Sequence, residues 1–375
     1  MDPQFYWGAA TASYQVEGGI ENNDWAEAAR QGKVPVAGRA TDHYNRFQED
    51  FSLARQLGHN AHRFSIEWSR IEPEEGVFDE SAVSHYAAVL DSLHTHGLEP
   101  FITLWHFTLP LWFSQQGGFE HPQAPEKFAR YCEYVLKHLG DKATYWITIN
   151  EPMVYASIGY RVGSWPPFQK NLLKFERVTK ALVQAHKLAY ERMKTIVPRV
   201  QIGIAKNNIH FTPGWHPLAL FMRWFWNHRF LRSISRYQDF IGLNYYFHHQ
   251  FCFRQQLPKS DMGWEIYPEG LYYVLMELKR YRKPVYILEN GIADTADTQR
   301  AQFITDHIKQ VDRARRDGLD VRGYFYWSLL DNFEWAYGFK PRFGLVAINY
   351  ATLERTVRPS ALEYQKLIQS SGILK

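Results

Sequence analysis

The segment YWITINEP, residues 145–152, shows most directly how this chain folds. Its first six residues, Tyr145–Asn150, form a short run of β-branched and aromatic side chains, which is the pattern of a buried strand. The run ends at Asn150 and Glu151, so polar side chains appear at the point where the predicted strand stops. The same arrangement, a short apolar run with a polar end, recurs along the chain.

Seven further runs of this type predict seven further strands. Together with Tyr145–Asn150, the expected strands are Phe5–Ala10, His62–Trp68, Pro100–His106, Val200–Asn207, Asp239–Tyr246, Pro284–Glu289 and Val321–Leu329. Between them, apolar residues recur with the 3.6-residue period of a helix, most clearly in Asp42–Leu57, Ser81–His96, Pro125–Leu139, Leu173–Ile196, Gly270–Tyr281 and Gln299–Asp317. Strands that alternate with helices indicate a parallel sheet.

The spacing of these strands favours a closed barrel over an open sheet. Strand starts recur roughly every 40 to 55 residues, which is one strand, one helix and a variable loop repeated along the chain. No Pro/Gly/Ser-rich linker sets off a second domain, so we expect one (β/α)8 TIM barrel over residues 1–375. A doubly wound sheet would favour a Gly-rich phosphate turn after its first strand, but the chain reads AATAS at residues 9–13.

The amino-acid composition argues against some classes of function and favours others. The 43 Lys plus Arg and 39 Asp plus Glu leave a net charge of +4 without long blocks of one sign, which argues against a nucleic-acid-binding surface. Aromatic residues make up 16% of the chain, and such an excess is typical of proteins that stack on sugar rings. No apolar run is long enough to span a membrane, and the start MDPQFYWGAATASY shows no signal-peptide pattern, so we expect a cytoplasmic protein.

The two cysteines, Cys132 and Cys252, give no sign of a disulfide or a metal site. They lie far apart in the sequence, without a CxxC or Cys/His ligand spacing. We therefore expect two reduced, buried thiols.

In a parallel barrel the functional site lies at the C-terminal ends of the strands. In strand order, the side chains expected there are Gln15 and Glu17, Arg63, His106, Asn150 and Glu151, Asn244, Tyr245 and Tyr246, Glu289 and Asn290, and then Trp327 with Asp331, Asn332, Phe333, Glu334 and Trp335. This set is rich in polar and aromatic residues.

Two glutamates, Glu151 and Glu289, end the fourth and seventh strands and are expected to face each other across the barrel mouth. Cleavage of an acetal needs a proton for the leaving oxygen and a negative group at the oxocarbenium-like centre. Two carboxyl groups of different pKa supply both, so no metal or cofactor is required. Either glutamate alone would more simply be a salt-bridged strand end, but the pair, each flanked by Asn, favours catalysis.

Six motifs in order give the chain a resemblance to a known family. They are GAATASYQVEG (8–18), RFSIEWSR (63–70), TINEP (148–152), DFIGLNYY (239–246), LENG (288–291) and WSLLDNFEW (327–335), the last followed by RFGL (342–345). Nearly end to end, the chain resembles family 1 glycoside hydrolases, the retaining β-glucosidase and β-galactosidase family. Each motif alone is weak, but six in the right order are specific.

The resemblance implies catalytic roles for five residues. Glu151 would be the acid/base, and Glu289 the nucleophile that forms the covalent glycosyl intermediate. Asn150 would bond the sugar 2-hydroxyl, Tyr246 would hold Glu289 in orientation, and Arg63 would keep Glu289 ionised. The retaining mechanism further implies a separation of about 5–5.5 Å between the two carboxyl groups.

The resemblance also implies a sugar-binding set. Gln15, His106 and Glu334 would bond the other hydroxyls, Trp327 would stack under the ring, and Trp335 would add a wall. For His106 a satisfied core histidine, and for Trp335 simple core packing, remain the alternatives. Relatives that cleave 6-phosphorylated glycosides carry Ser where this chain has Glu334, because a carboxylate there repels phosphate. Unphosphorylated glycosides are therefore expected.

Departures from the family pattern leave several points open. Residues 106–108 read HFT instead of HWD, Leu288 replaces Thr, and the stretch Asn208–Gln238 is shorter than usual. The shortening predicts a more open aglycone side. It also crowds five aromatic residues, Trp215, Phe221, Trp224, Phe225 and Trp226, into a patch that suits either a contact between copies of the chain or a hydrophobic aglycone.

The expected activity is that of a retaining exo-β-glycosidase for terminal β-D-glucosides, with β-galactosides and β-fucosides as side substrates. Three alternatives stay open: a transglycosylase, a hydrolase specialised for hydrophobic aglycones, and a non-catalytic sugar-binding relative. The presence of both Glu151 and Glu289 argues against the last. The sequence does not fix the oligomeric state.

Overall fold

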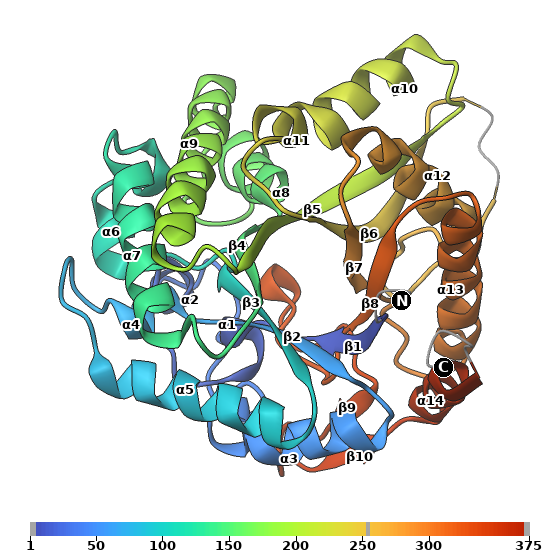
Figure 1. Cartoon of the computed structure of the whole chain (residues 1–375), viewed down its shortest axis with the longest axis horizontal. Helices are drawn as coiled ribbons and strands as arrows, with labels where there is room; N and C mark the ends of the chain where they lie inside the picture. Colours follow the sequence, from blue (N-terminus) through green and yellow to red (C-terminus); the bar gives the residue numbers. More distant parts are fainter. Residues whose placement is uncertain (1–4, 253–255, 371–375) are drawn as a thin grey trace.

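The computed structural model describes residues 5–252 and 256–370 of the chain. Residues 1–4, at the start of the N-terminal stretch analysed above, lie outside the described part. The described residues form a closed barrel of eight parallel strands in sequence order, with β8 pairing back onto β1. Figure 1 shows this ring with the long helices around it. The predicted single (β/α)8 barrel is confirmed, and the doubly wound alternative is wrong.

All eight predicted strands are present. They are β1 (Tyr6–Ala10), β2 (Ala61–Ser65), β3 (Glu99–Trp105), β4 (Tyr145–Asn150), β5 (Gln201–Thr212), β6 (Ile241–Gln250), β7 (Val285–Asn290) and β8 (Val321–Trp327), with a small antiparallel pair β9 (Val346–Ile348) and β10 (Arg355–Val357). Their side chains are almost all buried, since barrel strands face helices on one side and the barrel interior on the other. This two-sided burial explains why they read as continuous apolar runs.

The six predicted helices also form. They are α3 (His43–Gln56), α5 (Glu80–Thr95), α7 (Ala124–Leu139), α9 (Leu172–Ile196), α12 (Pro268–Leu278) and α13 (Arg300–Arg316). Shorter helices lie in the loops and at the C-terminal end: α1 (Ser13–Val16), α2 (Asp24–Arg30), α4 (Trp68–Ile71), α6 (Leu111–Gln115), α8 (Pro152–Ala156), α10 (Pro217–Met222), α11 (Arg229–Ser233) and α14 (Pro359–Ser370). Single turns complete the set: η1 (Gly118–Glu120), η2 (Ser157–Val162), η3 (Arg223–His228), η4 (Lys279–Tyr281) and η5 (Trp335–Tyr337).

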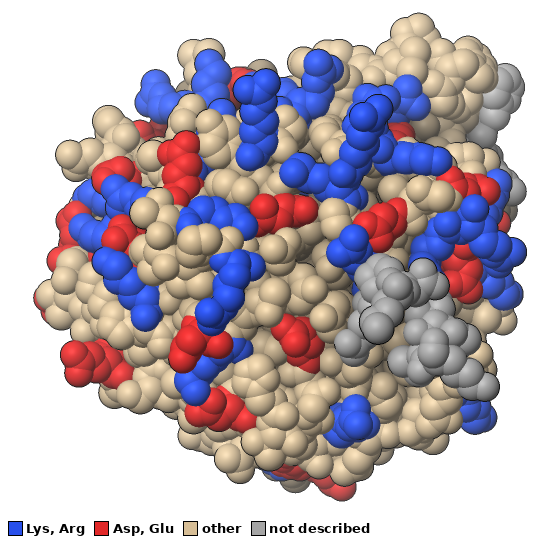
Figure 2. All heavy atoms as spheres, in the orientation of Figure 1, with Lys and Arg blue, Asp and Glu red and all other residues tan. Residues whose placement is uncertain are grey.

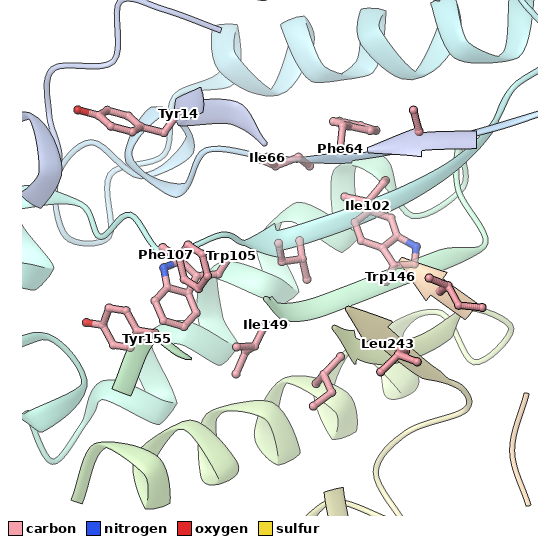
Figure 3. Close-up of a cluster of buried hydrophobic side chains, with 14 of the residues drawn as sticks. Tyr14, Phe64, Ile66, Ile102, Trp105, Phe107, Trp146, Ile149, Tyr155 and Leu243 are labelled. Carbon is pink, nitrogen blue, oxygen red and sulfur yellow. The ribbon is translucent and has the colours of Figure 1, made fainter. Parts of the chain in front are cut away.

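The core has two main parts. Between the strands and the helices, large side chains such as Trp105, Trp146 and Tyr155 pack in one extensive cluster, part of which is drawn in Figure 3. Inside the barrel, a second cluster that includes Phe101 and Phe325 fills the lumen. The barrel is therefore a packed core rather than a pore, and a large cavity opens at the end of the barrel where the strands end.

Strands β5 and β6 run further than the sequence predicts. The expected ends were Asn207 and Tyr246, yet pairing continues past a register shift from Ile209↔Phe247 to Thr212↔Gln250. Apart from the buried Phe211, these residues are partly buried or exposed, so their own pattern gives no strong strand signal, and mutual hydrogen bonding makes them strand. The result is a two-stranded extension that rises beyond the barrel rim on the side of the shortened region.

The two cysteines differ in burial. Cys132 is a buried free thiol, as expected, whereas Cys252 is a free thiol that is partly exposed, because it follows the end of the β6 extension. In residues 5–252 and 256–370, no helix combines the length and the apolar character needed to cross a bilayer.

Candidate active site

A cavity of about 570 Å³ opens at the C-terminal ends of the barrel strands. Nine of the ten predicted site residues line it: Gln15, His106, Asn150, Glu151, Tyr246, Glu289, Trp327, Glu334 and Trp335. The tenth, Arg63, is buried on β2 and contacts the cavity wall through Glu289. Residues separated by more than 300 positions therefore meet at one site, as the strand-end rule predicts.

Glu289, near the end of β7, is held by two partners. One of its oxygens, Oε1, accepts a hydrogen bond from the Arg63 guanidinium, and the other, Oε2, accepts one from the Tyr246 hydroxyl at 2.9 Å. Arg63 also donates to Asn150 Oδ1 at 2.7 Å and to Thr103 Oγ1 at 3.1 Å. One guanidinium thus fixes both the carboxylate and the neighbouring amide in place.

The electrostatic environment of Glu289 combines opposing effects. Burial raises the pKa of Glu289 above its usual value, while Arg63, Tyr246 and Asn244 each act to lower it. Arg63 therefore favours the ionised form, as expected, but does not fully offset the desolvation. Burial and the charge of Glu289 raise the pKa of the Tyr246 hydroxyl well above its usual value. The hydroxyl therefore stays protonated and donates a hydrogen bond to the carboxylate.

Glu151 follows β4 in a strained backbone conformation, with a φ of 44°. Pro152 starts helix α8 immediately after it, so the chain turns sharply there and aims the carboxyl group into the cavity. Its Oε1 accepts hydrogen bonds from Asn244 at 2.9 Å and from Asn207 at 3.1 Å. Burial, followed by the charge of Glu289, raises the pKa of Glu151 to about 7.

The two glutamates therefore have different surroundings within one cavity. Glu289 lies against a guanidinium, whereas Glu151 is bonded only by neutral amides. When only one of the two carboxyl groups is ionised, the positive charge of Arg63 favours ionisation of Glu289. This arrangement leaves Glu151 as the carboxyl group that can hold a proton near neutral pH.

The predicted hydroxyl-binding residues present unused polar atoms. Gln15 donates from Nε2 to Asn332 Oδ1 at 2.9 Å and to the Phe333 carbonyl at 2.8 Å, while its Oε1 has no hydrogen-bond partner within the described part of the chain. Asn150 Nδ2 lies 3.2 Å from His106 Nε2. Because an amide NH2 only donates, Nε2 must accept, and the unpartnered Nδ1 carries the proton. Buried polar atoms without partners are the ones that a sugar would satisfy.

Charge and protonation of these residues fit a neutral ligand. Burial and the nearby Arg63 lower the pKa of His106 well below its usual value, so the imidazole is uncharged. Burial and the charges of Glu289 and Glu151 raise the pKa of Glu334 to about 8. Glu334 therefore adds little negative charge near neutral pH but keeps a carboxyl group available for hydrogen bonding.

Two tryptophans provide the apolar walls. Trp327 ends β8 and lies nearly parallel to the His106 ring, with centroids 6.0 Å apart. The chain after Glu289 passes close beneath it, since a Cβ on Gly291 would lie 1.8 Å from the Trp327 carbonyl oxygen. Trp335 both lines the cavity and packs against buried aromatic rings such as Trp25, so wall and core packing are roles of the same residue.

Two asparagines contact Glu151, and a buried lysine lies beside one of them; of the three, only Asn244 was among the side chains expected at the strand ends. Asn207 and Asn244 face each other across β5 and β6, and both donate to Glu151. Lys206 is fully buried, donates to the Asn207 carbonyl, and lies 5.4 Å from the centre of the Trp226 ring. Burial lowers the pKa of Lys206 to about 7, although Glu151 opposes this effect. A lysine inside the apolar run IGIAKNN, residues 202–208, was the available signal.

The outer part of the cavity is more apolar than its base. Ile209 and Phe247 come from the strand extension, Trp226 from η3, and Ile158 from η2. Trp264 packs against Phe247, with ring centroids 4.7 Å apart. The shortened region thus supplies a wall of its own to the side of the cavity that lies beyond the two glutamates.

Sequence comparison places this arrangement among known proteins. Residues 1–216 and 247–373 match the profile of the family described as glycosyl hydrolase family 1. The chain is 34% identical to β-glucosidase A of Thermotoga maritima in an alignment 435 positions long, gaps included, that covers 98% of each protein. It is 31% identical to a β-galactosidase of Saccharolobus solfataricus in an alignment 467 positions long that covers 98% of this chain and 95% of that protein.

Solved structures agree with the sequence matches. A β-glycosidase from Pyrococcus horikoshii is 39% identical, with a TM-score of 0.91 over 99% of this chain and 96% of that one. The Thermotoga maritima β-glucosidase in complex with deoxynojirimycin is 33% identical, with a TM-score of 0.92 over 99% of both chains. Fold, order of motifs and sequence identity lead to one conclusion: the chain belongs to glycosyl hydrolase family 1.

Proposed function

We propose that this protein is a retaining exo-β-glycosidase that hydrolyses unphosphorylated terminal β-D-glucosides and, as side substrates, β-galactosides and β-fucosides. The observation that carries the proposal is the contrast between two cavity-lining carboxyl groups, one against a guanidinium and one bonded by neutral amides. Such a pair supplies a nucleophile and a proton donor within one site.

In the first step Glu289 attacks the anomeric carbon and Glu151 protonates the leaving oxygen. The C–O bond to the aglycone breaks, and an ester forms between the sugar and Glu289. Asn150 is held by Arg63 and His106, so its amide is fixed in position to bond the 2-hydroxyl as positive charge develops on the ring. Tyr246 fixes the other oxygen of the nucleophile.

In the second step the roles of the two glutamates change. Once Glu289 is esterified it carries no charge, so the repulsion that raises the pKa of Glu151 disappears. Glu151 then accepts a proton from water, which attacks the anomeric carbon and releases Glu289. Two inversions at the same carbon give a product with retained configuration.

Glu334 supports the preference for unphosphorylated sugars. It lies near Gln15, with its Oε2 3.4 Å from Gln15 Nε2, in a buried part of the cavity. A phosphate placed there would carry its negative charges into a buried region that holds the ionised Glu289, and Glu334 is itself driven toward its neutral form by the charges nearby. Among the described residues that line the cavity, none is a lysine or arginine that would compensate.

The pH dependence of kcat/KM should be bell-shaped. Glu151 must be protonated to act as an acid, so we expect activity to fall as pH rises through about 7, the pKa of this group. Glu289 must be ionised, so the acid limb should lie above the range of an ordinary glutamate, because burial raises the pKa of Glu289. Initial rates measured across pH with an unionisable glucoside test this, and an alkaline limb that persists in a Glu151→Gln variant would contradict the assignment.

The reaction type and sugar preference are tested with a panel of p-nitrophenyl α- and β-glycosides, followed by proton NMR of the anomer first released. We expect activity on the β-glucoside with the β-anomer appearing first, and weaker activity on the β-galactoside and β-fucoside. First release of the α-anomer would indicate inversion and exclude the two-step mechanism. A folded protein inactive on the whole panel would favour a sugar-binding role.

A second candidate, a hydrolase specialised for hydrophobic aglycones, is favoured by the outer cavity wall. Ile209, Trp226 and Phe247 offer apolar surface where the aglycone must lie, beyond Glu151. Including methyl and octyl β-glucosides in the same panel tests this candidate. We expect a higher kcat/KM for the octyl glycoside, and Trp226→Ala should reduce that advantage by about tenfold while sparing the methyl glycoside. Equal losses on both substrates would contradict it.

A further inference from the structure

The segment 212–238, between the extension of β5 and the start of β6, has an unusual composition. Its sequence is TPGWHPLALFMRWFWNHRFLRSISRYQ, which contains four arginines and no Lys, Asp or Glu. Its formal charge of +4 equals that of the whole chain. The first eleven residues, 212–222, carry no charged side chain, and the arginines follow at 223, 229, 232 and 236.

In the structure this segment forms consecutive helical elements, α10, η3 and α11, with an apolar outward stripe. Leu218, Phe221 and Trp224 are spaced three residues apart and are 46%, 53% and 43% exposed, and Trp215 just before them is 70% exposed. Three-residue spacing puts these side chains on one face of the helix. Large exposed apolar clusters are rare on monomeric proteins and mark sites of interaction.

The packing of the helix against the barrel does not account for this stripe. The family profile leaves residues 217–246 unmatched, a stretch that holds α10, η3 and α11 and also the first residues of β6. The inner side of the helix is packed through Phe225, which contacts Phe175 of α9. The outward apolar side chains are therefore a feature of this chain that its core packing does not explain.

The segment that carries the stripe also carries unpaired positive charge. Arg223 and Arg229 are paired with Glu277 and Glu176, but Arg232 and Arg236 are exposed and have no ion pair among the described residues. In Figure 2 the surface at the position of α10, at the upper right, is mostly uncharged, and blue side chains lie along the upper edge to its left, in the region of α11 and α9. Trp and Leu beside Arg is the composition of helices that lie in the interface of a membrane.

The stripe also borders the mouth of the cavity. Trp226 lines the cavity, whereas Trp224, two residues earlier on the same turn, is exposed outside it. Val162, another cavity-lining residue, is 48% exposed. A flat apolar phase that contacts Leu218, Phe221 and Trp224 would therefore lie close to the opening through which an aglycone enters.

We propose that the face formed by Trp215, Leu218, Phe221 and Trp224, hereafter the α10 face, docks on the surface of a membrane that contains anionic lipid. The apolar side chains enter the headgroup region, and the arginines of the segment attract the lipid phosphates. A second copy of the chain fits less well, because a symmetric contact would bring together two segments that each carry, among the described residues, two arginines without an ion pair and no acidic residue of their own. The docking is independent of the proposed glycosidase activity.

Sedimentation with large unilamellar vesicles tests the docking. Vesicles of phosphatidylcholine mixed with phosphatidylglycerol should bind the full chain, and vesicles of phosphatidylcholine alone should bind it more weakly. The double variant Leu218→Asp, Phe221→Asp should lower the partition coefficient by about tenfold or more, because two charges replace the inserted apolar side chains. Leu362→Asp is the matched control, since Leu362 on α14 has 47% exposure against 46% for Leu218. Circular dichroism and thermal unfolding establish that each variant folds.

A second variant keeps the test informative if the double variant does not fold. Arg232→Glu, Arg236→Glu changes only exposed charges and should weaken binding to the anionic vesicles without affecting the neutral ones. Equal binding of the unmodified chain to both vesicle types would overturn the proposed requirement for anionic lipid. No binding of the unmodified chain to either vesicle type would overturn the proposal. So would the finding that the chain is a dimer in analytical ultracentrifugation, that Leu218→Asp dissociates this dimer, and that vesicles bind neither the unmodified chain nor the variant.

Discussion

Glu289→Ala is expected to reduce kcat for β-glucosides by on the order of 10⁴-fold or more, because no other group can form the covalent intermediate. The variant should remain folded, although it leaves the Arg63 guanidinium buried without its carboxylate, and we expect a lower midpoint of thermal unfolding for that reason. Rates on p-nitrophenyl β-glucoside with circular dichroism of the same sample separate the two effects. Glu363→Ala, on the exposed side of α14, is the matched control and should be fully active.

Azide makes the Glu289→Ala result specific. The truncated side chain leaves space beside Arg63, and a small anion can occupy it and attack the anomeric carbon from the face that Glu289 used. The product should be the α-glycosyl azide, with inverted configuration, provided that the leaving group is good. If azide restores no rate while the variant binds glucose-like inhibitors normally, Glu289 is not the nucleophile.

Glu151→Ala should have an effect that depends on the leaving group. A 2,4-dinitrophenyl glycoside needs little protonation, so its kcat/KM should fall only slightly, whereas that of an alkyl glycoside should fall by about 10³-fold. Hydrolysis of the intermediate also slows, because no base activates water. A burst of dinitrophenol followed by a slow steady state is therefore expected in stopped-flow traces.

Glu151→Gln provides the comparison for Glu151→Ala. It keeps the contact with the amides of Asn207 and Asn244 possible but supplies no acidic proton, so its dependence on the leaving group should be as steep. Azide added to Glu151→Ala should speed turnover and give the β-glycosyl azide, the opposite anomer to that from Glu289→Ala. Losses of equal size for good and poor leaving groups would remove the acid role from Glu151.

The barrel could be predicted from the sequence because its strands are buried on both faces. A run such as YWITIN, residues 145–150, is apolar throughout, and its strand bounds are the ones observed. The ends of β5 and β6 were missed for the converse reason. His210, His248 and Gln250 are half-buried and polar, and they form strand only because β5 and β6 pair with each other beyond the barrel. Such pairing depends on partners distant in sequence.

The candidate site was predicted in the same uneven way. Residues within recognisable motifs, such as Glu151 and Glu289, line the cavity as expected. Asn207 was not singled out, because its contact with Glu151 depends on the register between β4, β5 and β6 and on an irregularity after Asn207. The direction of the pKa shift of Glu289 also could not be predicted from the sequence. The sequence indicates a nearby arginine, which lowers this pKa, but not the extent of burial, which raises it.

The pairing of β1 with β8 has a consequence for synthesis of the enzyme. Ala10 lies opposite Trp327, and Gln15 bonds Asn332, so the two ends of the chain complete one wall of the cavity. A growing polypeptide therefore contains both Glu151 and Glu289 before it contains Trp327 and Glu334. Contacts between residues that lie so far apart in the sequence form slowly and are the last to form. Nascent chains that stop before β8 should thus be inert, and catalytic competence should arise in a single step, when the last strand leaves the ribosome and the ring closes.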